Sequence, residues 1–388
     1  MFRITSMMKE LFKPTPVKDH RDPPGPVVIW NLIRRCNLGC KHCYAGSVDK
    51  VFNGELSSEE IYSVMDDLKA ARVPVLILSG GEPLLRPDIF DISQASKDKG
   101  FYTALSSNGT LITKDNIEDI AKINYDYVGV SIDGIGSVND AFRVKEGAYV
   151  EALNGIRLCK ERDLKVGLRF TLTEDNVEEF PKILDLLVEE GVDKFYLSHL
   201  NYAGRGNQNK GDDAYFKHTR WAMDMLFERC LANVQNGIEL EITTGNNDAD
   251  GIYMLQWVRK NFPDKAEHFL GKLIQWGGNA SGQNVANIDN LGNVHPDTMW
   301  WHHKLGNVKE RAFGDIWSDT SDPLMAGLKM RPRPVTGRCG DCTYLNVCNG
   351  NTRCRAHRVT NDYWTEDPGC YLSDEEIGLG ETSFAKAQ

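Results

Sequence analysis

Directly after a β-rich run at residues 27–33, the sequence reads Arg35-Cys36-Asn37-Leu38-Gly39-Cys40-Lys41-His42-Cys43-Tyr44. Thiolates are soft ligands, and three of them at this spacing can wrap one face of a cube-shaped iron–sulfur cluster. Three ligands on four irons leave one iron open, which is typical of a metal centre that binds substrate. A zinc site is the alternative, but it needs a fourth ligand, and His42 could hardly turn onto the same metal. The stretch therefore favours an iron–sulfur site built from Cys36, Cys40 and Cys43.

Around this stretch, strand-like and helix-like segments alternate. We predict strands at residues 27–33, 74–78, 102–106, 127–132, 166–172 and 194–200, with helices at 59–71, 87–99, 116–123, 148–162 and 177–190. This alternation is typical of a parallel sheet built from right-handed βαβ units. Six units are fewer than a closed eight-unit barrel needs. The predicted fold class is therefore α/β, a partial (β/α)6 barrel whose functional loops follow the carboxyl ends of the strands.

The 388 residues are enough for one large domain and a smaller second one. We expect five segments along the chain. They are an extended, proline-rich lead-in at 1–24, the barrel at 25–205, a mostly helical connecting segment at 206–282, a smaller cysteine-rich domain at 283–374 and a polar tail at 375–388. The cysteine-rich domain should open with a β-hairpin at 284–295.

Composition narrows the possible functions. A formal net charge of −10 argues against a general affinity for nucleic acid or anionic membranes. There is neither a run of about 20 apolar residues nor a signal-peptide core, so we expect a cytoplasmic protein. Ten cysteines in a cytoplasmic chain are more typical of metal ligands or catalytic groups than of disulfides.

A second group of cysteines lies near the end of the chain, at Cys339, Cys342 and Cys348, with Cys354 and Cys370 following. Structural zinc is a serious alternative here, because four thiolates on zinc would stabilise a small domain equally well. Two further cysteines, Cys159 and Cys230, lie in helical or apolar surroundings. We expect them to be buried and inert.

The spacing C-x3-C-x2-C, with Tyr44 after the last cysteine, resembles the signature of radical S-adenosylmethionine (SAM) enzymes, and the resemblance covers nearly all of residues 25–205. It implies that the open iron chelates SAM, and that one electron cleaves SAM to methionine and a 5′-deoxyadenosyl radical. Ser79-Gly80-Gly81-Glu82-Pro83 resembles the family segment that holds the SAM amino group. The implied cofactor-binding residues are Tyr44, Gly80, Gly81, Glu82, Pro83, Ser107, Asn108, Ser131, Asp133 and Arg169.

The second cysteine group resembles the SPASM/twitch region of some radical SAM enzymes, which binds auxiliary [4Fe-4S] clusters. This chain departs from the full pattern, because Asp297 and Thr352 stand where cysteines would be expected. The resemblance then implies one auxiliary cluster, held by Cys339, Cys342, Cys348 and Cys370, with Cys354 as the rival fourth ligand. The implied cofactors are two [4Fe-4S] clusters and SAM.

Residues 24–32, 197–206 and 295–303 resemble radical SAM enzymes of heme d1 biosynthesis in denitrifying bacteria. This implies a tetrapyrrole substrate, 12,18-didecarboxysiroheme, that loses two propionate side chains, and an electron donor such as a flavodoxin or ferredoxin. The residue types are compatible with such a substrate. Candidates are Tyr202, Trp300 and Trp301 for stacking, Arg205 and Lys210 for carboxylates, and His199, His295, His302 and His303 for the iron.

Three other functions stay open. A radical SAM heme synthase of the siroheme route would decarboxylate propionates to vinyl groups, so product analysis would identify it. A peptide-modifying SPASM enzyme often carries a peptide-recognition domain, for which the N-terminal segment has no strand–helix pattern. A non-catalytic electron carrier needs no open iron, so the three-cysteine site and Glu82 argue against it.

Overall fold

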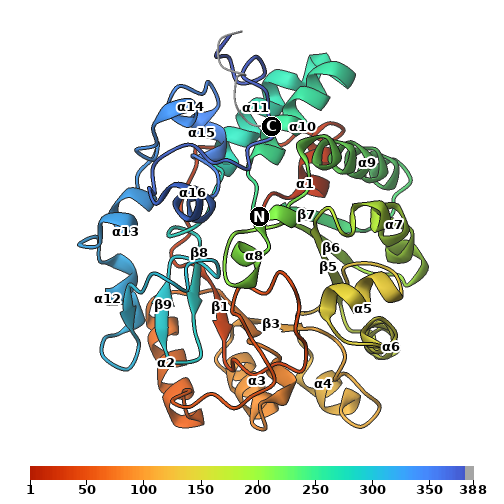
Figure 1. Cartoon of the computed structure of the whole chain (residues 1–388), viewed down its shortest axis with the longest axis vertical. Coiled ribbons are helices and arrows are strands. Elements are labelled where there is room, and N and C mark those ends of the chain that lie inside the picture. The colour runs from red at the N-terminus through yellow and green to blue at the C-terminus, as the bar shows by residue number, and fades with distance from the viewer. Residues whose placement is uncertain (381–388) are drawn as a thin grey trace.

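The computed structural model describes residues 1–380, and a single curved sheet runs through it (Figure 1). The strand order is β10-β9-β8-β1-β2-β3-β4-β5-β6-β7. The six predicted strands are confirmed and pair in parallel, as β1 (Val27–Asn31), β2 (Val75–Ser79), β3 (Tyr102–Ser107), β4 (Tyr127–Ser131), β5 (Val166–Leu172) and β6 (Lys194–His199). The sequence prediction of an α/β partial barrel is therefore confirmed.

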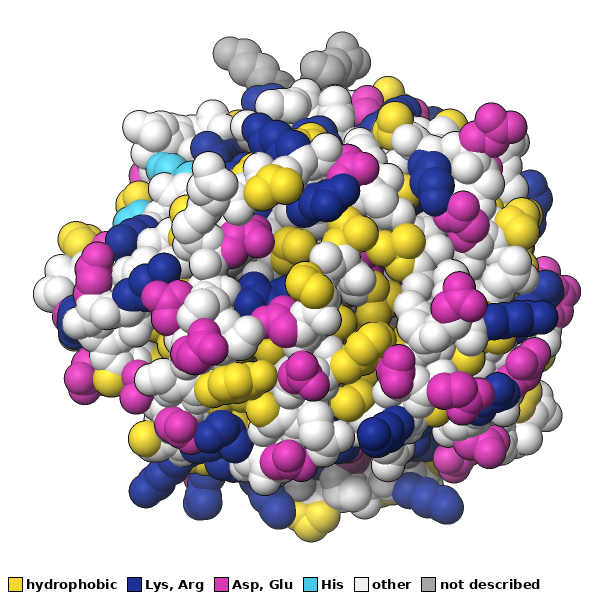
Figure 2. Space-filling model, turned by 90° about the horizontal axis from the view of Figure 1, so that it is seen from below, with side chains coloured by type: hydrophobic (Ala, Val, Ile, Leu, Met, Phe, Trp, Pro, Cys, Tyr) yellow, Lys and Arg dark blue, Asp and Glu magenta, His cyan; other side chains and the backbone are white. Residues whose placement is uncertain are grey.

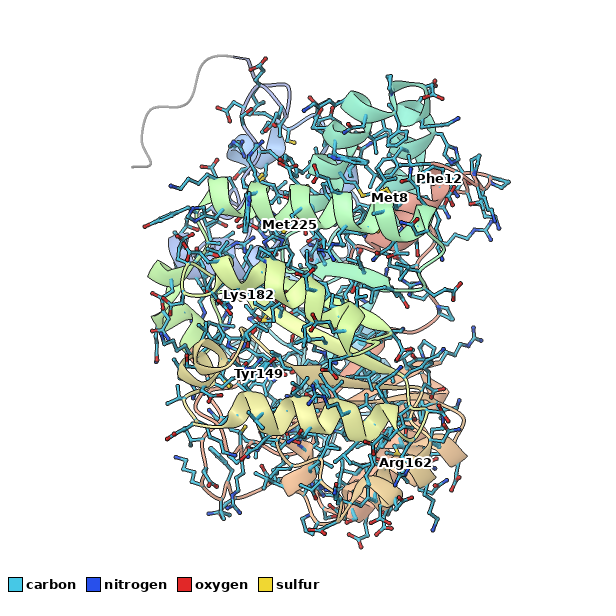
Figure 3. The ribbon with its side chains drawn as sticks, turned by 90° about the vertical axis from the view of Figure 1, so that its right-hand side faces the viewer. Met8, Phe12, Tyr149, Arg162, Lys182 and Met225 are labelled. Atoms are coloured by element: carbon cyan, nitrogen blue, oxygen red, sulfur yellow. The ribbon has the colours of Figure 1, made fainter. Side chains whose placement is uncertain are left out.

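Helices cover the outer face of this sheet. They are α2 (Ser58–Ala70), α3 (Ile89–Asp98), α4 (Ile117–Ile123), α5 (Ser137–Arg143), α6 (Ala148–Lys160) and α7 (Phe180–Glu189), with short 3-10 turns η1 (Pro83–Leu85) and η2 (Val177–Glu179). In α2, Ser57 and Glu60 form a capping box, and the apolar side of the helix packs on strand residues such as Val28 and Leu76. Figure 3 shows α6, α7 and α9 side by side, marked by Tyr149, Lys182 and Met225.

A seventh parallel strand, β7 (Glu241–Gly245), pairs with β6 inside the segment that we predicted to be mostly helical. Its neighbours are helical, namely α8 (Arg205–Gln208), η3 (Lys210–Asp212), α9 (Phe216–Gln235), α10 (Ala249–Asn261), η4 (Pro263–Lys265) and α11 (Ala266–Trp276). The strand has only five residues, and two of them are threonines, so its apolar signal is weak beside those of the long helices.

The N-terminal segment also differs from the predicted extended lead-in. Residues Ile4–Glu10 form a helix, α1, and the backbone of Phe2 pairs with Thr244 next to it. Ile4, Met7 and Met8 are spaced so that they lie on one side of the helix, where they are buried. Burial of this apolar side stabilises the helix, although the residues that follow it are rich in proline.

The C-terminal region extends the same sheet on its other side. Strand β8 (Val285–Ile288) pairs in parallel with β1 and antiparallel with β9 (Asn293–His295), so the predicted hairpin is present; β10 (Gly306–Asn307) follows. Five short helices complete the region, α12 (Phe313–Ser318), α13 (Pro323–Leu328), α14 (Gly337–Gly340), α15 (Leu345–Cys348) and α16 (Arg353–Thr360). In the predicted polar tail, Ile377 is buried, and residues 381–388 lie outside the described part.

The surface carries both signs of charge. Figure 2 shows acidic and basic side chains interspersed over one side of the molecule, with hydrophobic side chains gathered around a hollow near its centre. None of the helices in residues 1–380 combines the length and the apolar composition that a membrane span requires.

Candidate active site

The cysteine loop that follows β1 packs directly against two glycines at the end of β2. A Cβ on Gly80 would lie 2.5 Å from the carbonyl oxygen of Ile33, and one on Gly81 would lie 2.2 Å from that of Arg35. The Gly81 N–H donates to the Ile33 carbonyl at 2.6 Å. Glycine permits such a close approach, and the chain's own backbone is what approaches these two residues.

Two other segments hold the cysteine loop from its opposite side. At the end of α5, the carbonyl groups of Phe142 and Arg143 accept hydrogen bonds from the Lys41 and Gly39 N–H groups, each at 3.2 Å. At the start of α8, Arg205 donates to the carbonyl groups of Cys40, at 2.7 Å, and Ser47, at 2.8 Å. Arg205 thus holds the cysteine loop in place through hydrogen bonds, whereas the sequence suggested that it binds a carboxylate.

Each of the three thiols accepts a hydrogen bond from nitrogen. The donors are Asn108 Nδ2 to Cys36 at 3.8 Å, Arg143 Nη1 to Cys40 at 3.6 Å and the Ser47 N–H to Cys43 at 3.4 Å. Burial raises the pKa of Cys36 to about 12 and also raises that of Cys40. Such thiols are neutral until a metal displaces their protons. Three thiols with N–H donors, in an apolar setting with Leu38 and Ala148, fit a [4Fe-4S] cluster.

Asp133 is fully buried and its carboxylate already has protein partners. It pairs with the Arg143 guanidinium, and its Oδ1 accepts the Thr171 N–H at 2.6 Å. The Nε2 atom of His42 lies 3.9 Å from Asp133 Oδ2, and burial is the main cause that lowers the pKa of His42 to about 4. Asp133 therefore ties β4, β5 and α5 together behind the cysteines, and its predicted contact with SAM remains a prediction.

Glu82 connects the ends of β2 and β3. Its side chain has no exposure to solvent, and its carboxylate accepts from the Asn108 N–H at 2.7 Å, the Ser107 hydroxyl at 2.9 Å and the Leu84 N–H at 3.2 Å. Burial raises the pKa of Glu82 to about 7, although these hydrogen bonds act in the opposite direction. Pro83 then begins the turn η1.

Arg169 places a cation inside the barrel, near the carboxyl end of β4. Its Cα is paired with that of Ser131, its guanidinium donates to the Ser106 hydroxyl, and it lies 5.9 Å from the Tyr127 ring. Gly129 leaves the necessary room, because a Cβ there would lie 2.7 Å from the guanidinium. A half-buried guanidinium at this place is suited to bind a carboxylate.

The predicted SAM-binding residues therefore gather at one edge of the sheet, at the ends of β2 to β5 and beside the cysteine loop. Tyr44 belongs to this group, since its hydroxyl accepts from Asn31 Nδ2 at 2.9 Å at the end of β1. Sequence reasoning did not identify Arg143 as a residue of this site. It lies 103 residues from Cys40, and its local sequence carries no signal of the contact.

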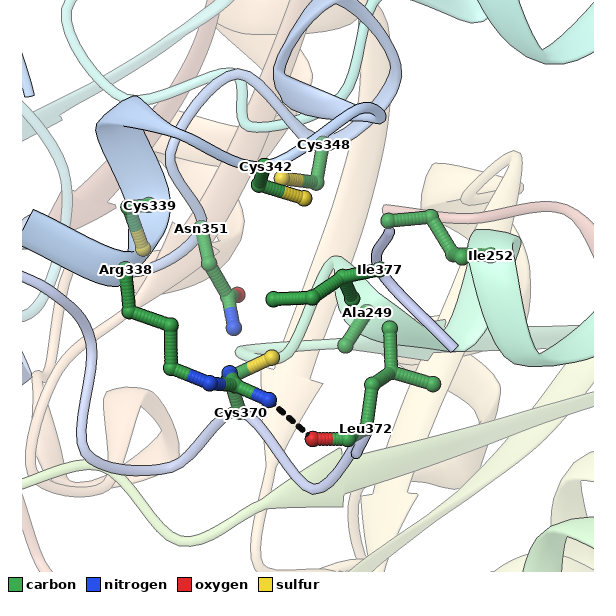
Figure 4. Close-up of a pocket in the computed structure, with 10 residues that line it drawn as sticks. All are labelled: Ala249, Ile252, Arg338, Cys339, Cys342, Cys348, Asn351, Cys370, Leu372 and Ile377. Carbon is green, nitrogen blue, oxygen red and sulfur yellow. Dashed lines mark hydrogen bonds between the residues drawn. The ribbon is translucent and has the colours of Figure 1, made fainter. Parts of the chain in front are cut away.

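The four predicted auxiliary ligands, Cys339, Cys342, Cys348 and Cys370, line one small cavity (Figure 4). Arg338 lies beside Cys370 in this cavity and donates to the Leu372 carbonyl. Four thiols around one cavity fit a [4Fe-4S] cluster. In residues 1–380, no three His, Cys, Asp or Glu side chains converge on one point as the ligands of a single ion do.

The rival ligand, Cys354, lies elsewhere. It packs with Trp300, Leu324 and Leu328, and its thiol donates to the Met299 carbonyl at 3.2 Å. Cys159 and Cys230 are fully buried, as predicted.

The candidate tetrapyrrole-binding residues fall into two groups. His199 and His295 are buried and contact carboxylates, His199 with Asp250 at 3.0 Å and His295 with Asp289 at 3.3 Å. Trp300 is also buried. By contrast, Trp301 is half-buried near Tyr44, with 6.2 Å between the two ring centroids, and His302 is exposed.

Comparison with known proteins agrees with this geometry. Residues 30–187 match the model of the Radical SAM superfamily. The chain is 52% identical over 380 residues to pre-heme d1 synthase from Dinoroseobacter shibae, and the alignment covers 97% of this chain and 94% of that protein. The chain belongs to the radical SAM superfamily. Radical SAM enzymes use a [4Fe-4S] cluster together with SAM, which are the cofactors that the three-cysteine loop and the polar strand ends fit.

Two further matches describe the rest of this radical SAM enzyme. It is 43% identical over 359 residues to Fe-coproporphyrin III synthase from Methanosarcina barkeri, covering 92% of this chain and 90% of that protein. Its fold matches that of SuiB from Streptococcus suis bound to the precursor peptide SuiA, with a TM-score of 0.72, 17% identity and coverage of 95% of this chain and 79% of that chain. The likeness to SuiB shows that the fold is shared through the C-terminal region as well as the barrel.

Proposed function

We propose that this radical SAM enzyme acts in heme d1 biosynthesis and removes two propionate side chains from 12,18-didecarboxysiroheme. The observation that carries the proposal is the 52% identity to pre-heme d1 synthase over nearly the whole of both chains. Function is most often retained at such identity when the site residues are also present. Here the cysteine loop and the polar strand ends are all in place.

The site residues have separable tasks in this proposal. The cluster and SAM, when bound, supply a 5′-deoxyadenosyl radical that takes a hydrogen atom from a propionate side chain. Cys36, Cys40 and Cys43 would hold the cluster, Glu82 would accept a hydrogen bond from the amino group of SAM, and Arg169 would bind its carboxylate. The hydrogen bonds that α5 and Arg205 make with the cysteine loop keep the three thiolates in place relative to these groups.

Activity on a defined tetrapyrrole tests the proposal. The protein is reconstituted without oxygen and incubated with SAM, a reductant and 12,18-didecarboxysiroheme, and 5′-deoxyadenosine and the tetrapyrrole mass are followed. We expect 5′-deoxyadenosine to form in a tetrapyrrole-dependent way, with loss of two propionate groups. Products with vinyl groups would instead indicate a siroheme-route heme synthase. Cleavage of SAM that ignores the tetrapyrrole would overturn the substrate and favour a peptide substrate.

We also propose that Cys339, Cys342, Cys348 and Cys370 hold a second [4Fe-4S] cluster. The shared cavity supports this set over one that contains Cys354. Two clusters correspond to about eight irons per chain. We expect about four irons in Cys370→Ala and about eight in the matched variant Cys354→Ala, because each cluster holds four. About four irons and one zinc in the unmodified protein would overturn the second cluster.

A radical SAM enzyme with this reaction needs an external source of electrons. We propose a flavodoxin or ferredoxin as the donor. The free cysteines of the chain support a cytoplasmic location for this partnership. To test this partner, the reduced donor protein is mixed with the enzyme in equal amounts. Reduction of the clusters is then followed by absorbance.

A further inference from the structure

Two histidines from distant segments face each other in the C-terminal region. His302 lies in the loop after β9, and His357 lies on α16. The distance between His302 Nε2 and His357 Nδ1 is 3.3 Å, and the two rings are stacked with their planes 5° apart. One imidazole must donate to the other, so each ring keeps one further nitrogen that this hydrogen bond does not use.

Aromatic side chains hold this pair of rings from behind. The His357 ring stacks on Tyr363 with 4.3 Å between centroids. The ring of Trp300, which is 1% exposed, lies 5.3 Å from His302 and 6.1 Å from His357. His302 itself is exposed. The pair is therefore fixed on its inner side and open on its outer side, as a binding group should be.

The same loop reaches the radical-generating site. Trp301, next to His302, lies 6.2 Å from the ring of Tyr44, which follows the cluster ligand Cys43, and the Arg34 guanidinium lies 5.7 Å from the Trp301 ring. A tetrapyrrole carries its iron at the centre and its propionates at the rim. A ligand to the iron must therefore lie at a distance from the carbon that reacts. His302 meets this condition, because it follows Trp301, whose ring lies near Tyr44.

The other candidate histidines already contact carboxylates. His199 contacts Asp250, His295 contacts Asp289, and His303 Nε2 lies 2.9 Å from Asp322. His302 and His357 instead contact each other. A neutral imidazole is the form that binds iron, and burial, with further contributions from Arg358 and His303, lowers the pKa of His357.

We propose that the His302–His357 pair binds the iron of the tetrapyrrole substrate. One imidazole is the axial ligand, and the other fixes the orientation of its ring through the shared hydrogen bond, as ligating histidines commonly require. The inference rests on the proposed function, because it presupposes an iron tetrapyrrole as substrate.

Spectroscopy of the bound substrate tests the pair independently of turnover. Ferric 12,18-didecarboxysiroheme is added to the reconstituted holoenzyme without reductant, and its absorption and electron paramagnetic resonance spectra are recorded. We expect the unmodified protein to give a saturable change from the spectra of the free tetrapyrrole to a signal of imidazole-ligated ferric iron. His302→Ala or His357→Ala, whichever removes the ligand, should lose this signal and bind the tetrapyrrole at least tenfold more weakly. Added imidazole should restore the signal.

A matched control is His268→Ala, because His268 contacts Glu10 on α1. This variant should keep the signal of imidazole-ligated iron. The inference is overturned if the single variants and the double variant all keep the signal, or if imidazole fails to restore it in a variant that has lost it. If the unmodified protein binds no tetrapyrrole, the proposed function fails, and the inference fails with it.

Discussion

Glu82 is a carboxylate without access to solvent, surrounded by donors from β3 and η1. Because burial raises its pKa to about 7, a large share of it is protonated near neutral pH in the free protein. Only the ionised form carries the charge that favours a hydrogen bond from an amino group. If Glu82 holds the SAM amino group, as we propose, binding must release a proton from Glu82 whenever the pH lies below this pKa.

The affinity for SAM should accordingly depend on pH. Below pH 7 we expect it to weaken by up to about tenfold per pH unit, and above pH 7 it should level off. Equilibrium dialysis of the reconstituted enzyme without oxygen between pH 6 and 8 measures this. Glu82→Gln should bind SAM weakly with little dependence on pH, and an unchanged slope in that variant would contradict the role of Glu82.

The cysteine loop also shows which contacts the local sequence can predict. The spacing of Cys36, Cys40 and Cys43 is a local pattern, and so it could be interpreted directly. Arg143 and Arg205 reach Cys40 across 103 and 165 residues. Only the folded sheet brings these arginines to the loop, so no spacing in the sequence predicts them.

At the level of elements, the junction between β2 and the cysteine loop depends on a glycine. Gly81→Ala would place a methyl group 2.2 Å from the Arg35 carbonyl oxygen, which is backbone and cannot turn away. We expect a loss of about 1–3 kcal/mol in the free energy of unfolding, and less iron at the first cluster. Gly211→Ala is the matched control, because nothing lies within 4 Å of the added methyl group. Urea unfolding and iron analysis of both variants, with equal results, would contradict this prediction.

The helix α1 and the strand β7 were not predicted because each is short and gains its stability from the other elements. Phe2 pairs with Thr244 of β7, and α1 packs against α9. Such elements carry a weak periodic signal, whereas α2 and α6 carry a long one and could be predicted.

The burial of α1 can be tested by comparing Met8, which lies on the helix, with Phe12, which follows it; both are labelled in Figure 3. Met8 is 0% exposed and Phe12 is 45% exposed. Met8→Ala should lower the free energy of unfolding by about 2–5 kcal/mol, because it leaves a cavity. Phe12→Ala should cost about 1 kcal/mol or less. Thermal melts in which both variants behave alike would show that α1 does not pack as described.

At the level of the whole molecule, a buried arginine joins the C-terminal region to the barrel. Arg355 on α16 binds the carboxylate of Asp367 at 2.7 Å and donates to the Leu200 carbonyl, after β6, at 3.1 Å. Burial would raise the pKa of Asp367, but the Arg355 guanidinium outweighs it and holds this pKa below its usual value. The stability from this pair is therefore present above the unfolded pKa of about 3.9 and is lost as the pH falls below it.

Asp367→Asn should lower the free energy of unfolding by about 3–5 kcal/mol at neutral pH, because it leaves a buried arginine without its counter-charge. Glu118→Gln removes an exposed carboxylate that pairs with Arg162, so this control should leave the stability almost unchanged. Denaturant unfolding at pH 7 compares the two variants. A small effect of Asp367→Asn would mean that the contact with Leu200 alone is enough to hold α16.

The sheet itself is larger than the sequence predicts. The six units of the barrel follow from the alternation of elements, but β8 joins them through contacts such as that of Asn287 Nδ2 with the Ile29 carbonyl, 258 residues away. Register over such a distance leaves no periodic trace in the chain. The domain boundaries at 205 and 282 therefore stay predictions, and the hydrogen bonds of the sheet run across both of them.

Strand β1 thus has a neighbour on each side, β2 from the barrel and β8 from the C-terminal region. Removing the C-terminal region would leave one whole side of β1 unpaired, and an exposed strand of this kind invites pairing with other chains. The barrel therefore cannot be separated from the C-terminal region without exposing this strand. A recombinant exchange of C-terminal regions between relatives must preserve the register of β8 on β1, so sequence changes in these two strands should be inherited together.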